Sequence, residues 1–277
     1  MLSEKMSLTP KYQALNELTL RCIWLMAEAW RDDPVPMLVF ENVPRLANRG
    51  RHLLDQIGAL LSHYGYAVAE TTHDCGVIGG LAQSRKRFLL VARHVEKVPS
   101  FLYEPEKKSL RAVGDILGRM PPRPAMKRTK GDAYLTGGHY GVVPWQGSAG
   151  AVSASAKHDN GRWSVADPRL PEANDRLTCI IESLDGTWHR PFTTLELAAL
   201  QSLVEPEEQL ELDGLSDQAW RERIGNAVPP AAAEAIGHVM GTTLLLAAQG
   251  ETFMLSSMPV WVRPVAVGLS VSQLATE

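Results

Sequence analysis

The sequence has few cysteines and no excess of either charge, and both features limit what it can do. Its 277 residues include three cysteines, Cys22, Cys75 and Cys179, which form no Cys-x-x-Cys pair. Neither a disulfide framework nor a zinc site is therefore predicted. The lack of a recognisable signal peptide favours a reducing, cytoplasmic compartment. Because the net charge is -3, any contact with nucleic acid must come from a local patch.

Long hydrophobic runs are also lacking. The most apolar run covers residues 244–248 with its flanks and is too short to cross a bilayer, so no membrane segment is expected. A hydrophobic fraction of 45% and a charged fraction of 21% are typical of folded globular proteins. Most of the chain should therefore fold.

Basic residues do gather in one stretch, between Lys107 and Lys130, which holds eight lysines and arginines. Lys127, Arg128 and Lys130 at its end are the candidates for contacts with the phosphates of double-stranded DNA. A solvated loop without any DNA contact is the alternative interpretation.

Periodic apolar residues outline the first hundred positions. Three- and four-residue steps predict helices over 15–30 and 53–61, and short apolar runs predict strands over 37–40, 66–69 and 88–92. The alternation of helix and strand favours an α/β sheet with right-handed crossovers. The first of these strands reads as buried on both faces of a parallel sheet.

The pattern changes in the middle of the chain and returns near its end. Prolines and glycines break up the stretch from about 99 to 184, which predicts a smaller, irregular and mainly β lobe. Helical spacing returns over 193–203 and 229–246, and short strands are expected over 260–262 and 265–267. The expected organisation is a sheet-bearing part over 1–98, the mainly β segment over 99–185, a return to the first part over 186–250, and a tail over 251–277.

Four short motifs occur in one order along the chain. They are Phe-Glu-Asn-Val-Pro from residue 40, Gln-Ser-Arg-Lys-Arg from 83, Arg-Pro-Phe-Thr-Thr-Leu-Glu from 190, and Gly-Asn-Ala-Val-Pro-Pro from 225. Taken singly, these motifs have simpler explanations. The first could be a solvent-exposed acid after a strand, the second a basic start of a strand, and the last a turn that ends one helix and begins the next. Their joint order resembles the later motifs of the DNA (cytosine-5) methyltransferases, in which a variable target-recognition segment separates the second motif from the third.

This resemblance implies an incomplete methyltransferase sheet of the Rossmann-like type, S-adenosylmethionine as cofactor, and duplex DNA as partner. It implies that Glu41 hydrogen-bonds a flipped cytosine and supports protonation of its ring nitrogen 3, and that Arg87 reaches the cytosine carbonyl oxygen. Arg85 would support the catalytic loop. The turn formed by Asn226, Ala227 and Val228 would line the cofactor pocket.

Three further residues of these motifs have structural roles by the same resemblance. Gln83 would brace its turn, while Arg190 and Glu196 would organise the recognition segment.

Two features of that family do not occur upstream of Glu41: the glycine-rich cofactor loop and the Pro-Cys-Gln loop with its nucleophile. We expect Cys22 on the apolar, core-facing side of the first helix. Cys75 follows Glu41 in the sequence, whereas the family's nucleophile precedes that glutamate. Cys179 is expected at a buried position of a strand. Three interpretations remain open. The chain is half of an enzyme completed by a separate polypeptide, a truncated inactive homologue, or a DNA-binding accessory module.

Overall fold

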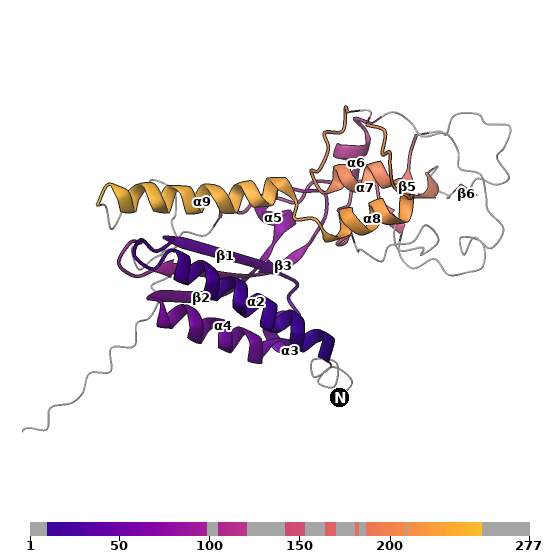
Figure 1. The fold of residues 1–277 in the computed structure, drawn as a ribbon. Coiled ribbons are helices and arrows are strands. Elements are labelled where there is room, and N and C mark those ends of the chain that lie inside the picture. Colours follow the sequence, from indigo (N-terminus) through magenta and orange to yellow (C-terminus); the bar gives the residue numbers. More distant parts are fainter. Residues whose placement is uncertain are drawn as a thin grey trace, which may run out of the picture. The chain divides into compact units, whose positions relative to one another are not determined.

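The computed structural model describes residues 10–98, 105–120, 142–152, 164–169, 181–182, 187–208 and 210–250. The chain divides into two compact units, and each of them contains segments that are far apart in the sequence (Figure 1). Unit 1 comprises Met1–Thr72, Phe88–Pro105 and Gly237–Glu277. Unit 2 comprises His73–Arg87 and Glu106–Ile236.

A three-stranded sheet forms the centre of unit 1. It consists of β1 (Met37–Asn42), β2 (Tyr66–Asp74) and β3 (Lys86–His94), in the order β1-β3-β2. The central strand β3 is antiparallel to β1, with Met37 opposite Arg93. The apolar residues at the start of β3 are almost wholly buried, as expected for a strand with a neighbour on each side.

The prediction of strands is confirmed, but their expected arrangement is wrong in part. β1 was expected to be buried on both faces of a parallel sheet, yet its only described neighbour, β3, runs antiparallel to it. Leu38, Val39 and Phe40 are only partly buried because β1 lies at an end of the described sheet. A continuous apolar run indicates burial without fixing the direction of the neighbouring strand.

Helices of unit 1 pack on this sheet through a shared apolar core. They are α2 (Pro10–Ala29), α3 (Leu46–Arg49) and α4 (Arg51–His63). The core combines buried residues of α2, α4 and the strands: Ile23, Leu54, Ile57, Leu61, Tyr66, Phe88, Leu90 and Ala92. Burial of each large aliphatic side chain stabilises the fold by about 2 kcal/mol. After α4 the chain turns into β2 through Gly65, whose φ of 82° favours glycine.

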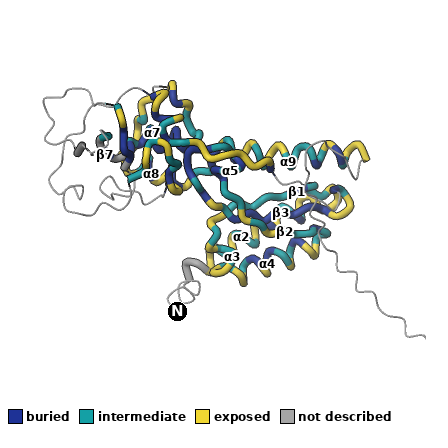
Figure 2. The backbone as a smooth tube through the Cα atoms, turned by 180° about the vertical axis from the view of Figure 1, so that it is seen from behind, coloured by how far each residue is buried: buried dark blue, intermediate teal, exposed yellow. Residues whose placement is uncertain are grey.

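The predicted burial of Cys22 is wrong, because this residue is exposed on α2. Leu18 and Leu25 on the same side of the helix keep 57% and 48% of their surface exposed. Ile23 and Ala27 are buried instead, each with 4% exposure. Figure 2 colours the backbone of the helix by burial. The helix has apolar residues on more than one side, and periodicity alone does not say which side a sheet will cover.

Unit 2 contains a second sheet of short strands, which agrees with the mainly β segment predicted for this part of the chain. β4 (Val142–Pro144), β5 (Ser164–Asp167), β6 (Ile181–Glu182) and β7 (Trp188–Pro191) lie in the order β4-β5-β7-β6. β4 and β5 are parallel, whereas β7 is antiparallel to both of its neighbours.

The helices of unit 2 pack around a core of fully buried residues. They are α5 (Cys75–Gly79), α6 (Val113–Leu117), α7 (Thr194–Leu200), α8 (Asp217–Asn226) and the first part of α9 (Pro230–Ala248), whose last part belongs to unit 1. The core includes Val113, Leu117, Val165, Phe192 and Leu197, each with 0% exposure. Three of these helices, α5, α6 and α8, were not predicted.

One helical stretch of the described residues, Asp217–Ala248, is long and apolar enough to cross a membrane by length and composition alone. Ala227 has extended backbone angles and ends α8, so the apolar part is α9 itself. Of the most apolar window of this stretch, 17% is buried.

Candidate functional site

Glu41 is the penultimate residue of β1 in unit 1, opposite Leu89 of the central strand. Its position follows from the apolar run before it, which forms the strand and leaves the acid at the strand's carboxyl end. The next residue, Asn42, accepts a hydrogen bond at 2.8 Å from the Val43 amide through its side-chain oxygen. This contact fixes the start of the loop that follows the strand.

Arg85 and Arg87 belong to unit 2, at the entry to β3, so Glu41 and the two arginines lie in different units. Arg87 is partly exposed and donates to the Lys86 carbonyl oxygen at 3.0 Å. Arg85 is only 1% exposed. Two arginines of one motif therefore have different environments, since one is accessible to a ligand and the other is enclosed.

The buried Arg85 side chain joins three segments of unit 2. It donates to the carbonyl oxygens of Val152 at 2.7 Å, Gly225 at 2.5 Å and Ala227 at 3.1 Å. Hydrogen bonds from a charged donor are stronger than neutral ones, and a guanidinium can serve several acceptors at once. The Gln-Ser-Arg-Lys-Arg and Gly-Asn-Ala-Val-Pro-Pro motifs are thus held together directly.

Asp74 holds the segment before Arg85 in place, and the sequence analysis missed this residue. Its carboxylate accepts from the Gly76 amide at 2.9 Å as the N-cap of α5, from the Ser84 hydroxyl at 2.6 Å and from the Arg85 amide at 2.8 Å. Burial alone would raise the pKa of Asp74, but these hydrogen bonds outweigh it and lower the pKa. Asp before a short helix is a recognised N-cap signal, so the sequence did contain the clue.

Two buried glutamines continue the same framework. Gln83 donates to the Leu200 carbonyl oxygen at 3.4 Å and accepts from the Val152 amide at 3.3 Å, so it links the end of α7 to the segment at Val152. Gln201 donates to the Ile224 carbonyl oxygen at 2.7 Å. The end of α8 is therefore fixed from two directions, by Gln201 and by Arg85.

The Arg-Pro-Phe-Thr-Thr-Leu-Glu motif forms a buried ion-pair cluster. Arg190 donates both terminal nitrogens to the two carboxylate oxygens of Glu196, each at 2.7 Å, and also binds Asp167. Glu196 accepts from the Thr193 amide at 2.8 Å, which completes a capping box at the start of α7. The motif organises the join between β7 and α7, and through Asp167 it also contacts β5.

The pKa of Asp167 reflects the same cluster. Burial would raise it, but hydrogen bonds from Arg169, together with the hydrogen bond and charge of Arg190, outweigh burial and lower the pKa. Burial would lower the pKa of Arg190, yet the neighbouring Glu196 and Asp167 carboxylates raise it. Both shifts favour the charged forms of Asp167 and Arg190.

Asn226, Ala227 and Val228 form the end of α8 and the turn that leads to α9. Asn226 is exposed, and the other two residues are half-buried. Arg85 binds the carbonyl oxygens of Gly225 and Ala227 and so anchors the turn, while Asn226 keeps an accessible surface.

Several predicted residues lie outside the described part of the chain. These are Lys127, Arg128 and Lys130, as well as Cys179 and the strands expected after residue 250. Cys75 is buried in unit 2 against Ala232. Within the described residues, no group of His, Cys, Asp or Glu side chains could hold a metal ion.

Solved structures with the same fold define the class of protein. An Entamoeba histolytica methyltransferase matches with a TM-score of 0.59 and 13% identity, over 87% of this chain and 74% of its own. The Dnmt2 methyltransferase of S. pombe matches with a TM-score of 0.52 and 14% identity, over 78% and 67%. A putative DNA modification methyltransferase from an E. coli prophage gives 0.53 and 16%, over 84% and 75%. The chain has a methyltransferase fold.

The sequence itself assigns the family. Residues 31–242 match the model of the C-5 cytosine-specific DNA methylases, and the chain belongs to this family. Among curated proteins, none matches the chain.

Proposed function

We propose that this chain supplies the base-recognition half of a DNA (cytosine-5) methyltransferase and that a separate polypeptide supplies the nucleophilic cysteine and the glycine-rich cofactor loop. The complete enzyme transfers a methyl group to carbon 5 of a flipped cytosine in duplex DNA. The observation that carries the proposal is the contact of Arg85 with the turn at Gly225 and Ala227, which joins two family motifs 140 or more positions apart.

The chemistry explains why such a half needs a partner. Carbon 5 of cytosine is a poor nucleophile until a thiolate adds to carbon 6, and this sequence has no Pro-Cys-Gln loop to provide that thiolate. Glu41 at the end of β1 donates a hydrogen bond to ring nitrogen 3 of the flipped base. Arg87 stabilises the developing negative charge on the base carbonyl oxygen.

Arg85 has a positioning role in this scheme, because its side chain is enclosed and binds backbone carbonyls. It holds the turn at Asn226, Ala227 and Val228 in the conformation that lines one side of the S-adenosylmethionine site. S-Adenosylmethionine supplies the methyl group when it is bound. The glycine-rich loop of the partner would form the opposite wall.

The test compares the purified chain with a co-purified pair. The partner is a polypeptide from the same genome that carries the Pro-Cys-Gln and glycine-rich loops. Transfer of labelled methyl groups to duplex DNA is expected from the pair and not from the chain alone. Robust transfer by the chain alone would overturn the need for a partner. A stable complex that binds DNA but transfers no methyl group would identify the chain as an accessory module.

A further inference from the structure

Strand β1 lies at an end of the described sheet although its sequence suits a more protected position. It pairs with β3 on one side, and no other described strand pairs with it. Its first four residues, Met37–Phe40, are apolar and uncharged. Exposed edge strands normally carry charged residues, prolines or bulges that prevent further pairing. The outer side of β1 lacks such protection over these four residues.

The hydrogen-bond pattern identifies which peptide groups face that outer side. The His94 amide donates to the Pro36 carbonyl oxygen, so Pro36 and His94 form a hydrogen-bonded pair. Bonded and non-bonded pairs alternate in an antiparallel ladder. With the observed register, the peptide groups of Met37 and Val39 point away from β3. A strand added at this edge would bind these groups.

Helix α2 presents an apolar stripe that the rest of unit 1 leaves uncovered. Leu18, Cys22 and Leu25 follow one another at helical spacing, and all three are exposed. They lie neither on the core side of the helix, which Ile23 and Ala27 form, nor on its α4 side. We call these three residues the outer stripe.

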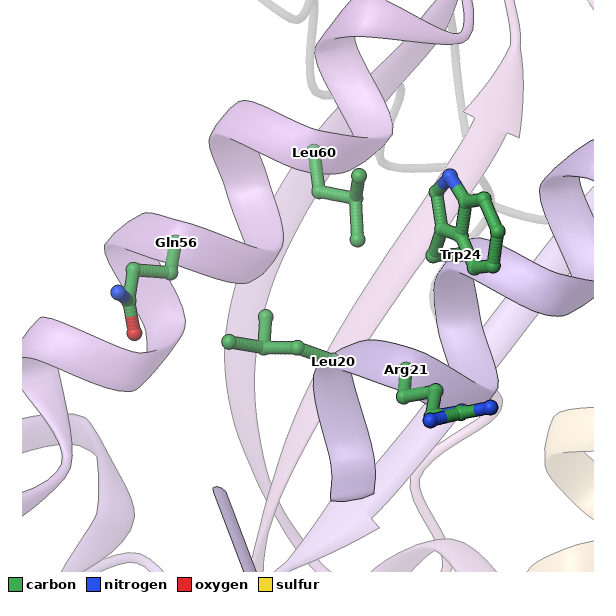
Figure 3. Close-up of a pocket in the computed structure, with 5 residues that line it drawn as sticks. All are labelled: Leu20, Arg21, Trp24, Gln56 and Leu60. Atoms are coloured by element: carbon green, nitrogen blue, oxygen red, sulfur yellow. The ribbon is translucent and has the colours of Figure 1, made fainter. Parts of the chain in front are cut away.

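The α4 side is defined by a shallow groove of about 580 Å³ between the two helices (Figure 3). Leu20 and Trp24 line it from α2, whereas Gln56 and Leu60 line it from α4. α4 already occupies this flank, whereas the outer stripe stays uncovered and offers an apolar surface to a further helix.

We infer that the outer edge of β1 and the outer stripe of α2 form the docking surface for the partner polypeptide, which adds a strand beside β1 and a helix beside α2. This inference rests on the proposed function, since it names where the partner of that enzyme binds. It places the partner's added strand directly beside the strand that carries Glu41.

The occupant is a chain with the missing catalytic loops rather than a second copy of this one. The three structural neighbours match over 74%, 67% and 75% of their own lengths, so each contains residues without a counterpart here. A second copy would pair β1 with β1 and would bring no Pro-Cys-Gln loop. A strand from a complementary chain would bind the outward-facing peptide groups of β1, and the same chain would supply the Pro-Cys-Gln loop.

Val39→Pro tests the edge in the co-expressed pair. Proline removes an amide that faces away from β3 and is tolerated at strand edges, so β1 should still pair with β3. The isolated variant should keep the circular dichroism spectrum and melting temperature of the wild type. Its affinity for the Pro-Cys-Gln polypeptide should fall about tenfold or more, as measured by calorimetry.

A second pair of variants tests the helix without changing the backbone. Leu25→Glu puts a charge on the outer stripe, and Val95→Glu puts the same charge at a 52% exposed site in the turn after β3. Only Leu25→Glu should weaken the complex. Alkylation of Cys22, mapped by mass spectrometry, should slow about tenfold on addition of the partner.

The outcomes separate this inference from the proposed function. An active complex whose affinity is unchanged by both Val39→Pro and Leu25→Glu, with Cys22 still reactive, would overturn the docking surface and leave the function standing. A homodimer sensitive to the same two changes, or a source genome without a Pro-Cys-Gln polypeptide, would also overturn it. Loss of binding in both variants, with Val95→Glu unaffected, would establish the surface even if no methyl transfer were detected.

Discussion

Arg85 and Gly225 are 140 positions apart in the sequence, yet the Arg85 guanidinium donates to the Gly225 carbonyl oxygen at 2.5 Å. The contact ties the entry of β3 to the last turn of α8. Because Arg85 is enclosed and also binds Val152, its removal would leave several buried carbonyl oxygens without a donor. The geometry of the turn at Gly225 and Ala227, which we propose lines the cofactor site, therefore depends on a residue that is too buried to touch a ligand.

Replacing Arg85 with lysine should destabilise unit 2. A single ammonium group cannot reach three separate carbonyl oxygens, so the free energy of unfolding should fall by about 3 kcal/mol. Urea unfolding followed by tryptophan fluorescence measures this change. Arg111→Lys, at an exposed position, is the matched control and should leave the midpoint unchanged. Equal midpoints for both variants would contradict the role of Arg85.

Acid should weaken the fold through Asp167, whose pKa is lowered in the folded chain. In the unfolded chain the pKa of an aspartate is about 3.9. The stabilising contribution is therefore complete above that value and is lost as the pH falls through the lower, folded pKa. Urea unfolding at a series of pH values below about 5 should show this loss.

Asp167→Asn should remove the acid-dependent loss attributed to Asp167 and lower the free energy of unfolding at pH 7 by about 3 kcal/mol, since Arg190 and Arg169 each lose a buried charged partner. Asp32→Asn, at an exposed site, is the control. An unchanged pH dependence in Asp167→Asn would show that other carboxyl groups cause the acid effect.

Two glycine substitutions should have effects of opposite sign. A Cβ atom at Gly76 would lie 1.8 Å from the Gln83 carbonyl oxygen, so Gly76→Ala must displace backbone and should cost about 3 kcal/mol. Gly58 in α4 has open space at that position, and Gly58→Ala should stabilise the helix by about 0.5–1 kcal/mol. Thermal melting of both variants provides the measurement. A neutral Gly76→Ala would mean that this segment is less tightly fixed than its contacts indicate.

In the complemented enzyme, Glu41→Gln should lower the rate of methyl transfer by about 10²- to 10⁴-fold, because the amide cannot deliver a proton. Binding of duplex DNA should change much less. Arg87→Ala should follow the same pattern. Single-turnover rates and DNA affinities measured side by side distinguish the two effects. A normal rate with Glu41→Gln would make Glu41 a bystander.

Neutralising Lys127, Arg128 and Lys130 together should weaken DNA binding in a salt-dependent manner. If all three contact phosphates, the slope of the logarithm of affinity against that of salt concentration should decrease by about three. Titrations of duplex DNA at several salt concentrations test this. Neutralising Arg21, Arg31 and Lys97, three basic residues of unit 1, serves as the charge-matched control. The same change of slope in both triple variants would point to net charge alone.

Local patterns predicted many of the longer regular elements, because such elements depend on neighbouring residues. The helices α2, α4, α7 and α9 and the strands of unit 1 follow apolar spacing and turn signals. Helix α8 was missed because its buried side includes Arg221 in place of an aliphatic residue. That arginine binds Asp217 and the Phe192 carbonyl oxygen, and no apolar period reveals such a helix.

The arrangement of the site could be predicted only in part, because it depends on distant contacts. The order of the motifs indicated the family, which the match over residues 31–242 confirms. The same order could not separate the enclosed Arg85 from the accessible Arg87, since both are arginines two positions apart. Arg85 is buried because the carbonyl oxygens of residues 152, 225 and 227 surround its guanidinium. Those residues are distant in the sequence, so no local pattern around Arg85 reveals the contacts.

The ion pair between Arg190 and Glu196 has a consequence for how such chains change over generations. Each residue would leave a buried charge behind if it alone were replaced, and a single loss of this kind is strongly destabilising. Selection for folding alone therefore suffices to keep both. Glu41 lies at the end of β1 and not in this buried cluster. Under the proposed function, selection for catalysis is what preserves it. A lineage that abandoned methylation would lose the glutamate of the first motif long before the arginine and glutamate of the third.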